Sequence, residues 1–393
     1  MNDQRIAWLL TAAPYYWHPV FSEFARQFPQ TILFTAKWPK FARGYEDSFT
    51  VKVVGNRKFL KVGSSTTGYG DTLMFLSPNI IGHLIKFRPH VIFADGFCLW
   101  TIFALLLKFL FWWRIVIVYD GSSPSVDYKN SKIRTFWRRL MARFIDACIT
   151  NNSAGKNYLV DVLGINKNIV FARPYLVPDV EALLHSFQSQ NTLNNIIENI
   201  TTQSHPKYPV VFLYIGQIIP RKGVRELLEA CLILKTQGYS NYILLIAGEG
   251  WQQQELEKFS ISHNLENNVK WLGQVEYSEL GSYLKYADVF IFPTHEDVWG
   301  MALTEAIALG KAVICSMQAG SCELVVEGKN GYLFNSKSPG KLADLMKYFI
   351  DNPELAISMG RYSEQLMSQH TPQIAAEFLT QVVYSVSHSH KVQ

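Results

Sequence analysis

Residues 295–305 read HEDVWGMALTE and follow an apolar run, VFIFPT (289–294). The apolar run is typical of a buried strand, and the residues from Gly300 onward predict a helix. The amide groups in the first turn of a helix have no partner within it, so they form a ready site for an anion. Asp297 in the loop and Glu305 about one turn into the helix would then lie at the edge of that site.

Two roles are open for these carboxylates. Glu305 could accept hydrogen bonds from two adjacent sugar hydroxyls, while Asp297 could contact another hydroxyl group. The alternative is purely structural, with Asp297 as the helix cap and Glu305 as a carboxylate that stabilises the helix dipole. The spacing alone favours neither.

A second motif, LYIGQIIPRKGVRELLEA, occupies residues 213–230. It predicts a strand that ends at Gly216, a loop that carries Arg221 and Lys222, and a helix that opens at Gly223. Two cations beside a helix start suit a diphosphate, and they would stabilise a leaving phosphate as its negative charge grows. The alternative is a solvated pair of charges on a surface loop.

Neither a metal nor a cofactor is expected. The sequence contains no Asp-x-Asp triplet, so Arg221 and Lys222 would supply the charge that a divalent metal supplies elsewhere. The stretch TAAPYYW (11–17) follows the first apolar run and lacks the Gly-x-Gly-x-x-Gly of a dinucleotide site. An NAD-dependent enzyme is therefore disfavoured.

Short apolar runs alternate with helical patterns along all 393 residues. This alternation predicts an α/β fold with two doubly wound parallel sheets. We expect a first domain at 1–185 and a second at 205–364, joined by a polar, Asn- and Gln-rich stretch at 186–209. Ten runs are predicted as strands, at 6–12, 31–36, 90–96, 115–121, 146–151, 210–216, 242–250, 269–275, 289–294 and 312–316.

The charge of the chain is divided unevenly. Residues 1–180 hold 22 Lys and Arg against 11 Asp and Glu, whereas residues 181–393 hold 15 against 21. A basic half suggests an anionic partner, which leaves nucleic acid, phosphorylated ligands and anionic lipid open. The five cysteines form no Cys-x-x-Cys pair, which favours a reducing cytoplasm over a disulfide framework or a zinc site.

Two apolar segments raise the question of a membrane. Residues 97–119 predict a very apolar helix followed by a strand, although their length would also suit a membrane-embedded helix. Residues 129–147 combine aromatic residues with six Lys and Arg, as amphipathic helices on anionic membranes do. The alternative for 129–147 is a core-facing helix with a solvated basic face.

The second half resembles the retaining GT-B glycosyltransferases of family 4 over roughly residues 210–335. The resemblance depends on the order of its motifs, which is more specific than any one of them. These motifs read GQIIPRKG, AGEG, WLGQV, YADVFIFPT and DVWGMALTEAIALGKAVICSMQAGSCELVVEGKNGYLF.

The resemblance implies two Rossmann-like domains that face each other across a cleft, with a C-terminal helix at about 365–393 packed back on the first domain. It also implies that Glu305 binds the ribose of a sugar nucleotide, that Asp297 contacts the transferred sugar and that Lys222 faces the diphosphate. Val275 would lie near the base. The remaining residues implied at the donor site are Gly216, Gln217, Trp299, Gly300, Met301 and Ala302.

Three positions depart from the family pattern. Asp297 stands where the family has Glu, and Gln217 replaces an Arg, whose charge Arg221 could supply. In the first half, Asp120 occupies the place of a His that often follows a middle strand in this family. His18 is the nearest substitute for that His, although a lone His is more often structural.

Together these patterns predict a metal-independent, retaining hexosyltransferase. It would move a hexose, with UDP-glucose favoured, to a glycan or a lipid-linked acceptor in polysaccharide or glycolipid synthesis. We expect it in the cytoplasm, with a contact to the inner face of the cell membrane through 129–147, and we expect no nucleic-acid partner. The alternatives are a sugar-nucleotide epimerase and a catalytically weak nucleotide-binding subunit on the same fold.

Overall fold

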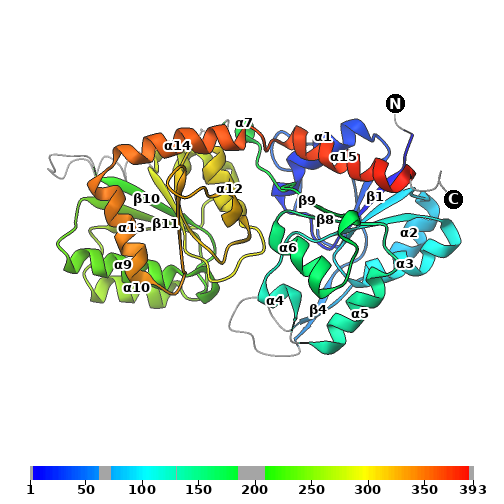
Figure 1. Ribbon diagram of the computed structural model, residues 1–393, viewed down its shortest axis with the longest axis horizontal. Helices are drawn as coiled ribbons and strands as arrows, with labels where there is room; N and C mark the ends of the chain where they lie inside the picture. The colour runs from blue at the N-terminus through cyan, green and yellow to red at the C-terminus, as the bar shows by residue number, and fades with distance from the viewer. Residues whose placement is uncertain (1–2, 62–71, 130, 185–208, 389–393) are drawn as a thin grey trace. The chain divides into compact units, whose positions relative to one another are not determined.

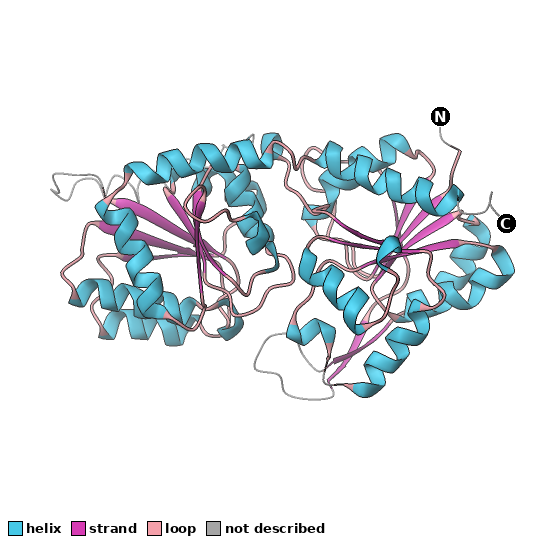
Figure 2. Cartoon of the chain, in the orientation of Figure 1, coloured by secondary structure: helices cyan, strands magenta, loops and turns pink. Residues whose placement is uncertain are grey.

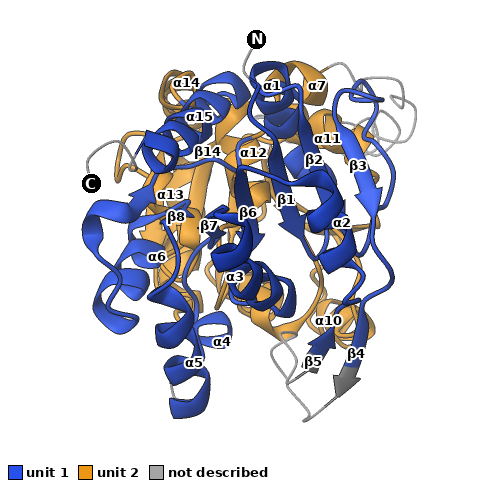
Figure 3. Ribbon diagram, turned by 90° about the vertical axis from the view of Figure 1, so that its right-hand side faces the viewer, with its two compact units in different colours: residues 1–65, 69–177, 370–393 blue, residues 66–68, 178–369 orange. Residues whose placement is uncertain are grey.

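The computed structural model describes residues 3–61, 72–129, 131–184 and 209–388. The chain divides into two compact units, coloured separately in Figure 3. Unit 1 comprises residues 1–65, 69–177 and 370–393, and unit 2 comprises 66–68 and 178–369. The stretch predicted between the domains, 186–209, lies almost wholly outside the described residues.

Unit 1 is built on a parallel sheet of seven strands in the order β3-β2-β1-β6-β7-β8-β9. Between β3 and β6 in the sequence, β4 (Lys58–Lys61) and β5 (Thr72–Phe75) form a separate antiparallel pair. The seven strands are β1 (Ile6–Leu10), β2 (Thr31–Thr35), β3 (Thr50–Val53), β6 (Val91–Asp95), β7 (Arg114–Val118), β8 (Ala147–Thr150) and β9 (Val170–Ala172).

Helices cover both faces of this sheet. Along β1, Ala7 and Leu9 join the core under α2 and α3, whereas the Trp8 ring contacts rings of α1. The alternation follows from the two-residue period of a strand, and it makes the sheet doubly wound. The helices of unit 1 are α1 (His18–Gln27), α2 (Ile80–Phe87), α3 (Leu99–Phe111), α4 (Pro124–Asp127), α5 (Lys132–Ala142), α6 (Ser153–Asn157) and α15 (Pro372–His388).

The C-terminal helix α15 completes unit 1 by packing on α1. Thr380 Oγ1 donates to Gln27 Oε1 at 2.6 Å, and Gln4 Nε2 donates to Ser387 Oγ at 3.2 Å. The apolar side of α15, which includes Leu379, is buried. The first and last described segments of the chain therefore belong to the same unit, and both termini are marked there in Figure 1.

Unit 2 has a parallel sheet of six strands in the order β12-β11-β10-β13-β14-β15. Helices α9, α10 and α13 cover one face, where apolar residues of the central strands form a continuous core with them. Helix α11 contacts β10 and helix α12 contacts β13, and Figure 2 shows helices in cyan around the magenta strands. The strands are β10 (Val210–Ile215), β11 (Tyr242–Ala247), β12 (Val269–Gly273), β13 (Val289–Phe292), β14 (Ala312–Ser316) and β15 (Gly331–Phe334). The helices are α7 (Val180–Leu184), α9 (Val224–Thr236), α10 (Gln253–Ser262), α11 (Leu280–Tyr286), α12 (Met301–Ala308), α13 (Pro339–Asp351) and α14 (Glu354–Met367).

The predicted α/β class with two doubly wound parallel sheets is confirmed, and each of the ten predicted strands is present. Residues 97–119 form helix α3 and strand β7, as expected. Within the described part of the chain, no helix combines the length and the apolar character needed to span a membrane. In the two main sheets, the sequence did not indicate β3, β9 and β15, which are short and lie at sheet edges.

Candidate functional site

The two motif loops of unit 2 meet at the carboxyl ends of neighbouring strands. Strands β10 and β13 are parallel and paired, so the loops that follow them lie at the same edge of the sheet. Gly223, the residue before α9, has φ +71°, and a Cβ there would lie 2.0 Å from the carbonyl oxygen of Pro293. The left-handed backbone and this close approach explain why glycine begins the helix. The two loops are therefore in direct contact.

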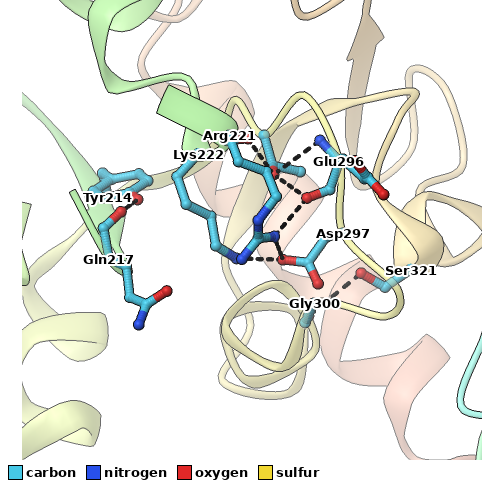
Figure 4. Close-up of polar contacts among 9 residues, drawn as sticks. Tyr214, Gln217, Arg221, Lys222, Glu296, Asp297, Gly300 and Ser321 are labelled. Atoms are coloured by element: carbon cyan, nitrogen blue, oxygen red, sulfur yellow. Dashed lines mark hydrogen bonds and ion pairs between the residues drawn. The ribbon is translucent and has the colours of Figure 1, made fainter. Parts of the chain in front are cut away.

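An ion-pair group joins these loops (Figure 4). Lys222 Nζ donates to Asp297 Oδ2, and Arg221 lies 3.9 Å from the same carboxylate oxygen. Arg221 also donates to the carbonyl of Glu296 at 2.7 Å. The side chains of Lys222 and Asp297 are only 13% and 12% exposed. The alternative of a solvated pair on a surface loop is therefore wrong.

Helix α12 begins beside this group. Its N-cap is Gly300, with φ +101°, and a Cβ there would lie 2.7 Å from the ring of Phe292. No side chain caps the helix, so the interpretation of Asp297 as a helix cap is wrong. Ser321 holds the loop in place, because its amide donates to Trp299 O at 2.7 Å and its hydroxyl donates to Gly300 O at 3.3 Å.

Glu305 lies in α12 and is buried. Burial raises the pKa of its carboxyl group to about 7, and a hydrogen bond from the Tyr277 side chain opposes that rise. Tyr277 follows β12 by a few residues and stands close in sequence to Val275, which is partly exposed. A carboxyl group about one turn into a helix, with a tyrosine side chain beside it, suits a ligand with several hydroxyls.

The remaining residues expected at the donor site lie around these loops. Gly216 follows β10, and the exposed Gln217 accepts a hydrogen bond at its carbonyl from the Tyr214 hydroxyl at 2.7 Å. Trp299 is buried, whereas Met301 and Ala302 at the start of α12 are partly exposed. In Figure 4, Gln217 stands apart from the group formed by Arg221, Lys222 and Asp297. The roles predicted for all of them stay predictions.

A second hydrogen-bonded chain supports the loop after β13. His295 Nε2 lies 3.0 Å from Glu226 Oε1 in α9, and His295 Nδ1 lies 2.9 Å from Ser336 Oγ. The amide of His295 donates to the carbonyl of Arg221 at 2.8 Å. His295 therefore ties the loop that carries Asp297 to the loop that carries Lys222.

In unit 1, polar side chains gather at the carboxyl edge of the sheet. Thr11 donates to Asp95 Oδ2 through its amide and hydroxyl, at 3.1 and 2.6 Å. Asp120 accepts from the Tyr175 hydroxyl at 2.8 Å. Burial, and then the charge of Asp95, raises the pKa of Asp120 to about 7. Asp120 thus lies where ligands bind open α/β sheets.

His18 is placed differently. It is fully buried among the rings of Trp38, Phe41 and Phe49, and its Nδ1 accepts from the Ala42 amide at 2.9 Å. Burial lowers its pKa to about 4, so the ring is neutral at neutral pH. These contacts favour a structural role for His18 over the substrate contact considered from the sequence.

Several site residues could not be found from sequence motifs. Tyr277, Tyr214, His295 and Asp95 belong to no spacing pattern with a known chemistry. The one signal was position, because each stands at or just beyond the carboxyl end of a strand, where loops of an α/β fold carry function.

Comparison with solved structures defines the class. The chain aligns over 98% of its length with all of the Anabaena protein HepE, solved with UDP and glucose, at a TM-score of 0.73 and 16% identity. It aligns over 95% of its length with 99% of WaaG, a glycosyltransferase involved in lipopolysaccharide biosynthesis, at a TM-score of 0.67 and 14% identity. At these identities the likeness shows the fold, which is GT-B.

Sequence comparison agrees with this class. Residues 195–366 match the family of glycosyl transferases group 1. The chain is 28% identical over 160 residues to a glycogen synthase of Mycobacterium tuberculosis, and 26% identical over 153 residues to an uncharacterized glycosyltransferase of Methanocaldococcus jannaschii. The two alignments cover 41% and 39% of this chain, and 38% and 42% of these relatives. The narrower assignment to family 4 stays a prediction.

Proposed function

We propose that the chain transfers a hexose from a UDP-hexose donor, with UDP-glucose favoured, to a hydroxyl of a glycan or lipid-linked acceptor. The observation that carries this proposal is the contact of Lys222 with Asp297 between two loops that adjoin helix starts. Such a place offers amides and a cation for a diphosphate and a carboxylate for the sugar. The HepE structures solved with UDP and with UDP-glucose support the choice of donor.

In this proposal each side chain acts on one part of the donor. Glu305, with Tyr277 beside it, accepts the ribose hydroxyls, and Val275 lies near the base. Lys222 donates to the diphosphate and keeps Asp297 as a partner, because an ammonium group has three donors. Asp297 accepts a hydroxyl of the transferred hexose. Arg221 supports the loop, since its guanidinium already binds the carbonyl of Glu296.

The proposed reaction retains the configuration of the sugar. The bond between the anomeric carbon and the phosphate oxygen breaks as the acceptor oxygen attacks from the same face. The proton of the acceptor hydroxyl passes to the departing phosphate oxygen, which accounts for every atom without a further base. Positioning and the cation at the diphosphate then supply most of the rate. Unit 1 supplies the acceptor contacts, with Asp120 at the carboxyl edge of its sheet.

The acceptor class leads to a proposed location. A lipid-linked acceptor in polysaccharide or glycolipid synthesis would place the enzyme in the cytoplasm at the inner face of the cell membrane. The basic stretch 129–147 of unit 1 supports this contact, because exposed cations attract anionic lipid headgroups.

Incubation with several radiolabelled sugar nucleotides tests the proposal. We expect release of UDP and transfer, or slow hydrolysis, of one hexose with the anomeric configuration retained, and undiminished activity in EDTA. Formation of a new sugar nucleotide would instead identify an epimerase. Binding of UDP without turnover of any donor would identify a nucleotide-binding subunit. Loss of activity in EDTA that magnesium restores would reject metal independence.

A further inference from the structure

We propose that α3 and α5 of unit 1 form one surface that binds an anionic lipid bilayer. The inference deepens the membrane contact proposed above, on which it rests, by naming a surface of two helices and the class of lipid. It concerns residues of α3 that the basic stretch 129–147 does not include.

The outer side of α3 is apolar and exposed. Leu106, Phe109 and Leu110 are 67%, 64% and 72% exposed, and their spacing places them on one side of the helix. Trp112, at the left-handed end of α3, is 78% exposed. Soluble proteins scatter such residues singly, whereas a contiguous patch marks an interaction site.

Helix α5 presents a similar stripe. Ile133, Phe136 and Trp137 are 73%, 62% and 57% exposed, so this part of the helix does not face the core, whereas Met141 and Ile145 are buried in it. The stripe continues to Phe144, whose ring contacts that of Phe109 with centroids 5.7 Å apart. Because this contact joins the two stripes, they form one continuous surface, and Figures 1 and 3 show the two helices as neighbours.

Two arginines of α5 bind the protein itself. Arg138 donates to the carbonyls of Asp127 and Val126 at 2.9 and 3.0 Å. The Arg134 guanidinium lies 3.8 Å from the ring centroid of Tyr128. The helix is therefore turned so that these arginines contact the protein while Ile133, Phe136 and Trp137 contact solvent and Met141 faces the core. This is the reverse of an ordinary surface helix.

The charge around the apolar surface selects the occupant. Residues 97–147 contain eight Lys and Arg and three Asp. Asp127 is buried, and Asp146 pairs with Lys108 and Arg114. Lys132, Arg139 and Arg143 are exposed on or just after α5. A second copy of the chain on a two-fold axis would bring like charges together, whereas an anionic bilayer accepts both the cations and the apolar side chains. Tryptophan also favours the interface between water and lipid.

Flotation of the full chain with vesicles of phosphatidylcholine, with or without phosphatidylglycerol, tests this surface. We expect binding to the anionic vesicles only, and weaker binding at high salt. The pair Phe109→Ser and Trp137→Ser should lower binding at least tenfold. The pair Lys132→Glu and Arg143→Glu reverses two charges. It should lower vesicle binding more than the loss of two charges would, because each cation near the surface is worth roughly fivefold in binding.

Matched controls lie on unit 2. Ile261→Ser with Ile357→Ser removes equally exposed apolar residues, and Lys258→Glu with Lys341→Glu makes the same change of charge. Both pairs should bind vesicles like the unchanged protein, and all variants should bind UDP normally, which separates this test from that of the proposed function. Quenching of tryptophan fluorescence by brominated lipid in the unchanged protein gives a measurement that needs no variant.

Three outcomes would overturn the proposal. The first is no binding of the unchanged protein to anionic vesicles at low salt, together with no quenching. The second is equal loss of binding in the unit 2 controls, which would indicate general attraction by charge or apolar residues. The third is a dimer in solution that the Phe109 and Trp137 pair makes monomeric without any vesicle binding, which would identify an interface between two copies.

Discussion

Glu305 is the carboxyl group that we propose binds the ribose of the donor. It is buried in α12 with a pKa of about 7 and receives a hydrogen bond from Tyr277. If it holds ribose hydroxyls, Glu305→Ala should weaken binding of UDP by about 1.5–3 kcal/mol, the usual worth of a hydrogen bond to a charged group. Calorimetry checks this, with Glu279→Ala on the adjacent 3-10 turn as a control. An unchanged UDP affinity in a folded variant would reject the assignment.

The same carboxyl group predicts a dependence of stability on pH. Its pKa is raised from 4.5 to about 7 in the folded protein, so the folded state holds the proton more tightly than the unfolded state. The free energy of unfolding therefore falls as pH rises from 4.5 to 7 and then levels off. Glu305→Gln should remove this part of the slope. Thermal unfolding without ligand at pH 5 to 8 measures it, and identical slopes in both proteins would contradict the raised pKa.

Lys222 and Asp297 should act on turnover as a coupled pair, because their side chains are in contact. Lys222→Ala should lower kcat by about 10²–10³, as expected when charge that stabilises a leaving group is lost. Asp297→Asn should lower kcat while UDP affinity stays within about threefold. The double variant should lose less than the sum of the two single effects. Strictly additive losses would show that the two residues act independently.

The candidate site illustrates what the sequence could and could not predict. The motifs placed Lys222, Asp297 and Glu305 near one strand edge, because parallel strands bring their carboxyl ends together. They could not predict the ion pair, since its partners are 75 positions apart and a carboxylate at this spacing also suits a helix cap. Nor could they show that Tyr277 reaches Glu305, because that contact depends on how the segment after β12 packs against α12.

Among the elements, the start of α9 carries the sharpest steric requirement. Gly223 has φ +71°, and a Cβ would lie 2.0 Å from the Pro293 carbonyl. Gly238, just beyond the end of the same helix, has φ +84° and open space around it. Gly238→Ala should therefore lower the free energy of unfolding only by the strain of a left-handed alanine, about 1–2 kcal/mol.

Gly223→Ala should cost more and also weaken UDP binding, because the loops that carry Lys222 and Asp297 must move apart. Chemical unfolding and UDP calorimetry on both variants make the comparison. Equal destabilisation of the two proteins would mean that the loop contact is soft enough to absorb a methyl group.

The strands were predictable where their apolar runs were long and unbroken. Central strands such as β11 are buried on both faces and read as unbroken apolar runs. By contrast, β3 at a sheet edge is mostly exposed, so its residues, TVKV, carry little apolar signal. The apolar residues of α5 were correctly assigned to one helix, but periodicity could not say which of them contact solvent. Ile133, Phe136 and Trp137 do, whereas Met141 is buried.

At the scale of the whole molecule, each unit has its own core. Leu379 in α15 and Leu342 in α13 are both fully buried, one in each unit. Either leucine changed to alanine should destabilise its own unit by about 2–5 kcal/mol. Only unit 2 carries the proposed donor site. Saturating UDP should therefore raise the unfolding temperature of unit 2 in Leu342→Ala more than that of unit 1 in Leu379→Ala.

Calorimetric scans with and without UDP distinguish the two cases. A single transition that shifts equally in both variants would show that the units unfold as one.

The position of α15 at the end of unit 1 affects how the chain folds during its synthesis. Unit 1 combines residues up to 177 with residues from 370 onward, and 178–369 is synthesised in between. At roughly 5–20 residues per second, the apolar side of α1 waits about 20–70 s for its partner, α15. Unit 2, made of one nearly continuous segment, can fold first, so the half that starts earliest is finished last. During this time a chaperone can bind the exposed apolar side of α1. A stop codon before α15 would remove the last element of unit 1 and so destabilise the unit that is encoded mainly upstream of it.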